Sequence, residues 1–124
     1  MHAGAAGKLL LACLSPEMRK EILYRTGLPR LTPHTITTLK GIEHELADIR
    51  RDGYAMSLAE RAVHVFSVTG PIRGFAGEVI AALNLSRPKV RFAPEKLNEY
   101  IRMVGETADK ISREFGYEGK KLEA

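Results

Sequence analysis

The stretch YAMSLAERAVHVFSVTGPIRGFAGEVIAALNLS, residues 54–86, decides the fold of this 124-residue chain. It contains three runs that are predicted to be strands, Tyr54–Ser57, Val63–Thr69 and Val79–Ser86. Turn sequences separate the second and third runs, namely Gly70-Pro71 and then the segment 74–77. The stretch therefore predicts an antiparallel sheet whose last two strands form a hairpin.

Polar side chains are predicted to gather on one face of this sheet. Side chains alternate between the two faces of a strand, so residues two apart share a face. The residues predicted on the shared face are Ser57, Ser67, Asn84 and Ser86, with Ala55, Val63, Val65, Ile80 and Ala82 around them. A mostly apolar surface with a few hydrogen-bonding groups is typical of a small-molecule site. A one-residue slip in register would turn these groups to the other face.

Three helices are predicted before the sheet. Small residues favour a first helix over Ala3–Leu14, and an N-cap serine followed by proline favours a second one over Pro16–Arg25. A loop with two prolines leads to a third helix, which Thr37 or Thr38 caps and Gly53 ends. The inward face of this third helix is predicted to carry Leu39, Ile42, Leu46 and Ile49.

One long helix is predicted after the sheet. It starts at Pro94 and is closed by Gly116, and we expect it to lie across the back of the sheet. Its apolar side carries Leu97, Ile101, Val104, Ala108, Ile111 and Phe115. The element order predicts an α+β domain over residues 1–116, an antiparallel sheet with flanking helices, followed by a charged tail over 117–124.

The composition is that of an ordinary soluble globular domain, with 44% hydrophobic and 27% charged residues. No apolar run approaches the ~18 residues of a membrane span, and the start has no signal-peptide pattern, so we expect a cytoplasmic protein without membrane contact. The net charge of +4 is scattered along the chain, which favours solvated surface charge over a nucleic-acid site. The single cysteine, Cys13, excludes an internal disulfide, and its leucine neighbours predict a buried, inert thiol.

Four motifs stand out when the chain is read as a whole. They are HAGAAGK at 2–8 with LLA at 10–12, LTPHTIT at 31–37, IRRDGYA at 49–55, and AALNLS at 81–86. In this order and spacing they resemble the C-terminal effector-binding domain of IclR-family transcriptional regulators. The resemblance covers nearly the whole chain.

The resemblance implies a GAF-like domain that senses a small metabolite, often an organic or aromatic acid, and is not an enzyme. It also implies self-association to a dimer or tetramer. We expect no cofactor and no metal. In such regulators DNA is bound by a winged helix-turn-helix, which would lie outside this chain. Because the family domain normally begins with further strands, the resemblance implies a partial domain.

Carried over position by position, the resemblance also implies a set of pocket residues. The backbone amides of Ala5 and Ala6, at a helix start, would hold a ligand carboxylate. Ser67, Asn84 and Ser86 would orient its other oxygens. Ser57 completes the polar set, and the apolar walls are predicted to be Leu9, Met56 and Val65.

The sequence departs from the family next to this set. The run Ser57-Leu58-Ala59-Glu60 stands where the family usually has several acids, and His64 takes the place of a glycine. Fewer carboxylates make the site less negative, which favours an anionic ligand over a cation or a metal ion.

The residues alone leave two other classes of protein open, an enzyme and an oligomerisation module. An enzyme would need a nucleophile with a base, and the predicted pocket has serines without a base unless His64 or His2 turns inward. A metal site built from the four histidines lacks short ligand spacing. If the family's first strands are missing, an unpaired sheet edge would favour a stand-alone oligomerisation module without a ligand.

Overall fold

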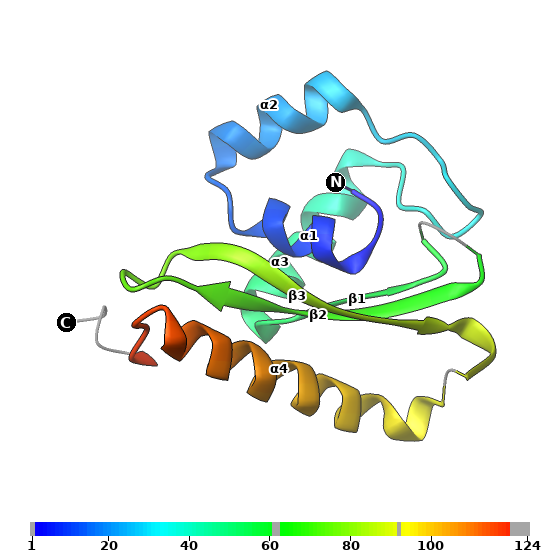
Figure 1. Ribbon diagram of the computed structural model, residues 1–124. Coiled ribbons are helices and arrows are strands. Elements are labelled where there is room, and N and C mark those ends of the chain that lie inside the picture. The colour runs from blue at the N-terminus through cyan, green and yellow to red at the C-terminus, as the bar shows by residue number, and fades with distance from the viewer. Residues whose placement is uncertain (1, 61–62, 92, 120–124) are drawn as a thin grey trace.

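The computed structural model describes residues 2–60, 63–91 and 93–119 (Figure 1). Its elements are α1 (Ala5–Ala12), α2 (Pro16–Thr26), α3 (Leu39–Asp52), β1 (Ala55–Leu58), β2 (Val65–Arg73), β3 (Val79–Pro88), short 3-10 turns over Lys89–Arg91 and Pro94–Lys96, and α4 (Leu97–Glu114). The predicted α+β class is confirmed, because a three-stranded antiparallel sheet is flanked by helices on both faces.

The helix ends follow the local sequence signals. The Ser15 hydroxyl accepts a hydrogen bond from the Met18 amide at 3.3 Å and caps α2. The Thr38 hydroxyl accepts from the Gly41 amide at 3.1 Å, so Thr38 rather than Thr37 caps α3. Gly53 ends α3 in the left-handed conformation, with φ at 79°, which a residue with a side chain rarely adopts.

The predicted turn at Gly70-Pro71 is wrong, because β2 continues through both residues to Arg73. The pairing of β2 with β1 ends at Thr69, and beyond this point β2 pairs only with β3 within the described part of the sheet. Pro71 has no amide hydrogen, and it lies in this part of β2, where one edge of the strand is unpaired. Gly70 allows α4 to come close, since a Cβ at this position would lie 3.2 Å from the Val104 Cγ1 atom. Only the segment 74–77 forms the hairpin turn, closed by the Gly77 amide and the Gly74 carbonyl at 3.0 Å.

The two faces of the sheet are covered by different helices. Figure 1 shows α4 running along one face, where the Phe66 and Tyr100 rings lie 5.9 Å apart. The opposite face is covered by the short helix α1, which contacts all three strands and packs on α3. The long C-terminal helix therefore lies across the back of the sheet, as predicted, and leaves the face with the serines to α1.

A hydrophobic core lies between α1, α2, α3 and β1. Its buried residues are Ala5, Leu9, Leu11, Ala12, Leu23, Ile42, Leu46, Ile49 and Ala55. Three predictions of buried residues are wrong, since Leu39, Phe115 and Cys13 are all exposed. Each sits at or just beyond a helix end, where the periodicity of the apolar stripe no longer determines which way a side chain points.

The predicted boundaries shift by a few residues. The second strand starts at Val65 rather than Val63, and α1 starts at Ala5 rather than Ala3. The last five residues of the predicted tail, 120–124, lie outside the described residues. Within the described part of the chain, every helix is too short or too polar to cross a membrane.

Candidate functional site

A pocket of about 660 Å³ opens between the start of α1 and the sheet face that α1 covers. This volume falls within the roughly 300–1,000 Å³ usual for small-molecule sites. The described residues that line it are His2, Ala3, Gly4, Ala5, Ala6, Gly7, Leu31, Ser57, Val65, Ser67, Asn84 and Ser86. Segments far apart in the sequence thus meet around one cavity.

Three serines form a row across the floor of the pocket. Ser57 lies opposite Ser67, and Ser67 lies opposite Ser86, in the antiparallel register. Directly opposite residues point to the same face with their Cβ atoms about 4.5–5.5 Å apart. Because each hydroxyl both donates and accepts, this row can bind several oxygen atoms of a ligand.

Asn84 lies beside the serine row and is held by two side-chain hydrogen bonds. The buried Thr69, which is its cross-strand neighbour, donates its hydroxyl to Asn84 Oδ1. Asn84 Nδ2 donates to Ser86 Oγ at 2.6 Å. Because Ser86 accepts in this bond, its own hydroxyl hydrogen remains available to a ligand. Thr69 was not predicted, although its position two residues after Ser67 puts it on the same face.

The start of α1 presents backbone amides to the pocket. Gly4 is the N-cap residue, so no side chain caps the helix. The Lys8 amide makes the first bond of the helix, to the Gly4 carbonyl at 3.2 Å. The amides of Ala5, Ala6 and the next residue therefore have no acceptor within the helix. Free amides and the positive end of the helix dipole favour an anion at this wall.

His2 and Leu31 complete the lining and were not among the predicted pocket residues. His2 is buried, and its Nε2 donates to the Pro29 carbonyl at 2.7 Å. This bond ties the start of the chain to the loop that carries Leu31. Both residues fall within the motifs at 2–8 and 31–37, which is the sequence signal that could have indicated them.

Most of the predicted site residues line the pocket together, namely Ala5, Ala6, Ser57, Val65, Ser67, Asn84 and Ser86. Leu9 and Met56 do not line it. Leu9 is 2% exposed and belongs to the core under α1. Strand alternation turns the Met56 side chain away from the face that carries Ser57. Among the described lining residues, the apolar wall expected from these two side chains is formed by Val65, Leu31 and the small residues of α1.

The described lining contains no Asp, Glu, Lys or Arg side chain. His64 is exposed and lies outside this lining, and His2 is engaged by a backbone carbonyl. In the part of the chain that the structure describes, no three His, Cys, Asp or Glu side chains come together as metal ligands would. The groups that this lining offers are therefore hydroxyls, a side-chain amide and backbone amides, which form hydrogen bonds.

A family model described as the C-terminal domain of bacterial IclR transcriptional regulators matches residues 1–113. The match assigns the chain to a class of bacterial transcriptional regulators. The chain belongs to the IclR family and corresponds to the C-terminal domain of its members. As the resemblance implied, this is a family of regulators rather than of enzymes.

Two curated relatives illustrate the match. The repressor AllR of Klebsiella pneumoniae is 33% identical over 116 residues, which are 94% of this chain and 43% of AllR. The regulator KdgR of Dickeya chrysanthemi is 34% identical over 117 residues, which are 94% of this chain and 38% of KdgR. The chain spans less than half the length of these relatives.

Solved structures show the same fold. The C-terminal domain of KdgR from E. coli has a TM-score of 0.86 and 34% identity, covering 94% of this chain and 71% of that domain. The IclR protein of Thermotoga maritima has a TM-score of 0.84 and 36% identity, and the match covers 94% of this chain and 47% of that protein chain. A third structure is a double mutant of the inducer-binding domain of PobR from Acinetobacter in complex with 3-hydroxybenzoic acid. It has a TM-score of 0.84 and 32% identity, and the match covers 90% of this chain and 64% of that one.

Proposed function

We propose that this chain is the effector-binding domain of an IclR-type regulator and binds a small carboxylate in the pocket beside α1. One observation carries the proposal: the free amides at the start of α1 face a row of hydroxyls across a pocket whose described lining has no acidic side chain. Amides at a helix start stabilise a negative charge, and hydroxyls on the opposite wall bind the remaining oxygens.

In this proposal the amides of Ala5 and Ala6 hold the carboxylate. Ser67, Asn84 and Ser86 orient the other polar atoms of the ligand, and Val65 contacts its apolar part. An organic or aromatic acid has the required combination of one carboxylate and an apolar body. A structural neighbour, the PobR domain, is described in complex with such an acid, 3-hydroxybenzoic acid.

In the complete regulator, the ligand would favour one arrangement of the domains and so change DNA binding. This requires a ligand that binds two arrangements with different affinity. DNA would be bound by a part of the regulator outside these residues, and the regulator would act in the cytoplasm. Neither a metal ion nor another cofactor is part of the proposal.

Ligand binding should raise the stability of the chain. At a ligand concentration 100 times the dissociation constant, the free energy of unfolding should rise by about 2.7 kcal/mol, which corresponds to about 10 °C in Tm. The measurement is thermal unfolding with a panel of acetate, succinate, benzoate and 3-hydroxybenzoate. Asn84→Ala removes the amide that connects Thr69 to Ser86 and should abolish the shift.

The matched control is Asn98→Ala. Asn98 is exposed on α4, on the other side of the sheet, so this variant should keep the full ligand-dependent shift. A parent protein that unfolds cooperatively and shows no shift with any compound would contradict the proposal. An equal shift in Asn84→Ala would contradict the assigned site.

A second candidate function, self-association, is favoured by the edge of the sheet. Among the described strands, β3 pairs only with β2, and its stretch from Val79 to Ser86 carries neither a charge nor a proline. Natural edge strands usually carry such residues because they prevent pairing with another chain. We propose that this edge pairs with a second copy and forms a dimer or tetramer.

Light scattering coupled to size-exclusion chromatography tests the oligomer. The parent should have the mass of a dimer or tetramer, and Ile80→Lys, which puts a charge on the exposed part of β3, should shift it to the monomer. Val90→Lys is the control, because Val90 is also exposed but lies beyond the end of β3. A monomeric parent at every concentration would rule out this second candidate.

A further inference from the structure

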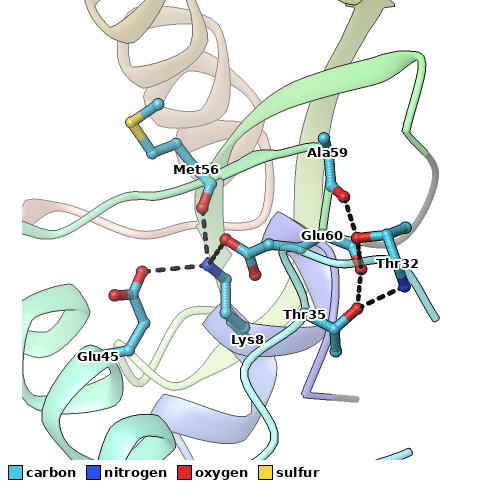
Figure 2. Close-up of polar contacts among 7 residues, drawn as sticks. All are labelled: Lys8, Thr32, Thr35, Glu45, Met56, Ala59 and Glu60. Atoms are coloured by element: carbon cyan, nitrogen blue, oxygen red, sulfur yellow. Dashed lines mark hydrogen bonds and ion pairs between the residues drawn. The ribbon is translucent and has the colours of Figure 1, made fainter. Parts of the chain in front are cut away.

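A lysine of α1 is completely buried. Lys8 lies in α1, and its side chain has no exposed surface. Its ammonium group has three hydrogens and three acceptors: Glu45 Oε1 at 3.0 Å, Glu60 Oε2 at 2.9 Å and the Met56 carbonyl at 2.8 Å. Figure 2 shows the Lys8 nitrogen between these three oxygens, which come from α3, β1 and the residues just after β1. One side chain thus joins three elements.

Glu60 connects this cluster to the loop at residues 27–38. Its carbonyl accepts hydrogen bonds from the hydroxyls of Thr35 and, at 3.4 Å, Thr32. The Thr32 hydroxyl also donates to the Ala59 carbonyl, as Figure 2 shows. The same loop supplies Leu31 to the pocket. Glu60 therefore holds α1 through its side chain and the loop through its backbone.

The backbone between Ser57 and Glu60 is strained. Ala59 has φ at 63° and is the only residue other than glycine with positive φ in the described part of the chain. It is fully buried. Such a conformation is unfavourable for alanine and persists only where surrounding contacts impose it. Here the Ala59 amide donates to the Val65 carbonyl at 3.0 Å, and the Ala59 carbonyl accepts from the Thr32 hydroxyl. The next residue, Glu60, is held by Thr35 and Lys8.

The charge of Glu60 depends on Lys8. Burial raises the pKa of the Glu60 carboxyl, the nearby Lys8 ammonium opposes this shift, and Glu45 adds to it. The second oxygen, Oε1, is buried and has no partner among the described residues. A negative charge in this position is taken out of water, and the Lys8 ammonium at 2.9 Å is the cation that compensates it.

We propose that Lys8 is the positioning residue of the pocket: through Glu60 it fixes the amide wall at the start of α1 against the wall formed by β1 and the loop. Lys8 does not line the pocket itself, so it acts through Ala5 and Ala6, which precede it in the same helix, and not by touching a ligand. The ligand measurement below rests on the proposed function, whereas the measurement without ligand does not.

The first test uses Glu60→Gln in the ligand-free protein. This variant keeps the size of the side chain. It leaves no buried charge without a partner, because Lys8 still contacts Glu45. Residue 60 is 52 residues from Lys8 in the sequence. The backbone amide resonances and hydrogen-exchange rates of Ala5 and Ala6 should change, although neither residue is near the substitution in sequence. The control is Glu43→Gln, which weakens the ion pair of Arg19 Nε with Glu43 Oε1 at 3.3 Å, outside the pocket lining.

The second test measures affinity for 3-hydroxybenzoate by calorimetry. The double variant Lys8→Met/Glu60→Gln removes Lys8 and the more buried of its two carboxylate partners, and it leaves only the partly exposed Glu45 without its cation, so it should fold. Its dissociation constant should rise at least about tenfold because the two walls lose their fixed spacing. Arg19→Met/Glu43→Gln removes an ion pair of α2 and α3 in which Arg19 is buried and Glu43 is partly exposed, and this variant should bind like the parent.

The outcomes separate this inference from the proposed function. If the Ala5 and Ala6 amides respond to Glu60→Gln and not to Glu43→Gln, the positioning role stands even where the parent binds no compound. Unchanged amides, or amides that respond equally in both variants, overturn it. Where the parent binds 3-hydroxybenzoate, parent-like affinity in Lys8→Met/Glu60→Gln, or an equal loss in the Arg19→Met/Glu43→Gln control, also overturns it.

Discussion

Lys8→Met alone should lower the free energy of unfolding by about 3–5 kcal/mol, because it leaves two carboxylates without the cation that compensates them. Most of the loss should come from Glu60, because its side chain is only 14% exposed, whereas that of Glu45 is 34% exposed and partly hydrated. A loss of this size is a large part of the total stability of a small domain, roughly 5–15 kcal/mol. Urea unfolding followed by circular dichroism gives the value.

The pH dependence of this loss identifies its cause. A carboxyl whose pKa is raised by folding stabilises the folded state below the pKa of the unfolded chain, and this contribution is lost as the pH rises through the folded pKa. Burial already raises the pKa of Glu60, and without Lys8 it should rise further. The deficit of Lys8→Met should therefore be largest at neutral pH and smaller at acidic pH. A deficit independent of pH, or below about 1 kcal/mol, would show that the ion pairs are not its source.

Phe66→Ala is expected to lower the free energy of unfolding by about 3–5 kcal/mol. Phe66 is fully buried on the α4 face of β2, against the ring of Tyr100 at 5.9 Å. The substitution removes apolar surface from the core and leaves a cavity between the sheet and α4. Chemical denaturation at a fixed temperature measures the change.

Tyr24→Ala is the control for Phe66→Ala. Tyr24 is an aromatic residue on α2 that is 93% exposed, so its removal should change stability by no more than about 0.5 kcal/mol. Comparable losses in the two variants would mean that the sheet and α4 do not form the packed interface described above.

Strand alternation predicted the polar floor of the pocket because the sheet has a regular register through that region. Alternation predicted that Ser57, Ser67 and Ser86 share a face, and the register of the strands sets them in one row. The helix ends could also be predicted from the sequence, because Ser15, Thr38 and Gly53 act on the helix ends next to them. The motifs at 2–8 and 81–86 then associated the start of α1 with this floor.

The remaining features depend on contacts that no local pattern contains. β2 can contain Pro71 because β1 is short and does not pair with β2 at this position. The residues next to Pro71 in the sequence do not indicate the length of β1. A lysine in an amphipathic segment predicts a solvated side chain, yet Lys8 is buried by carboxylates 37 and 52 residues away. The resemblance placed Leu9 at the pocket wall, but the turn of the helix directs its side chain into the core.

Successive residues of β2 serve different purposes. Phe66 and Val68 face α4 and hold the domain together, while Val65 and Ser67 face the pocket. Under the proposed function, substitutions at Val65 and Ser67 can therefore alter ligand preference during evolution with little effect on the interface with α4. The loss of a single codon within this strand would exchange the two sets of side chains, placing serine in the core and phenylalanine in the pocket. Divergence among related domains should accordingly proceed by replacement at these positions, with insertions and deletions confined to the turns.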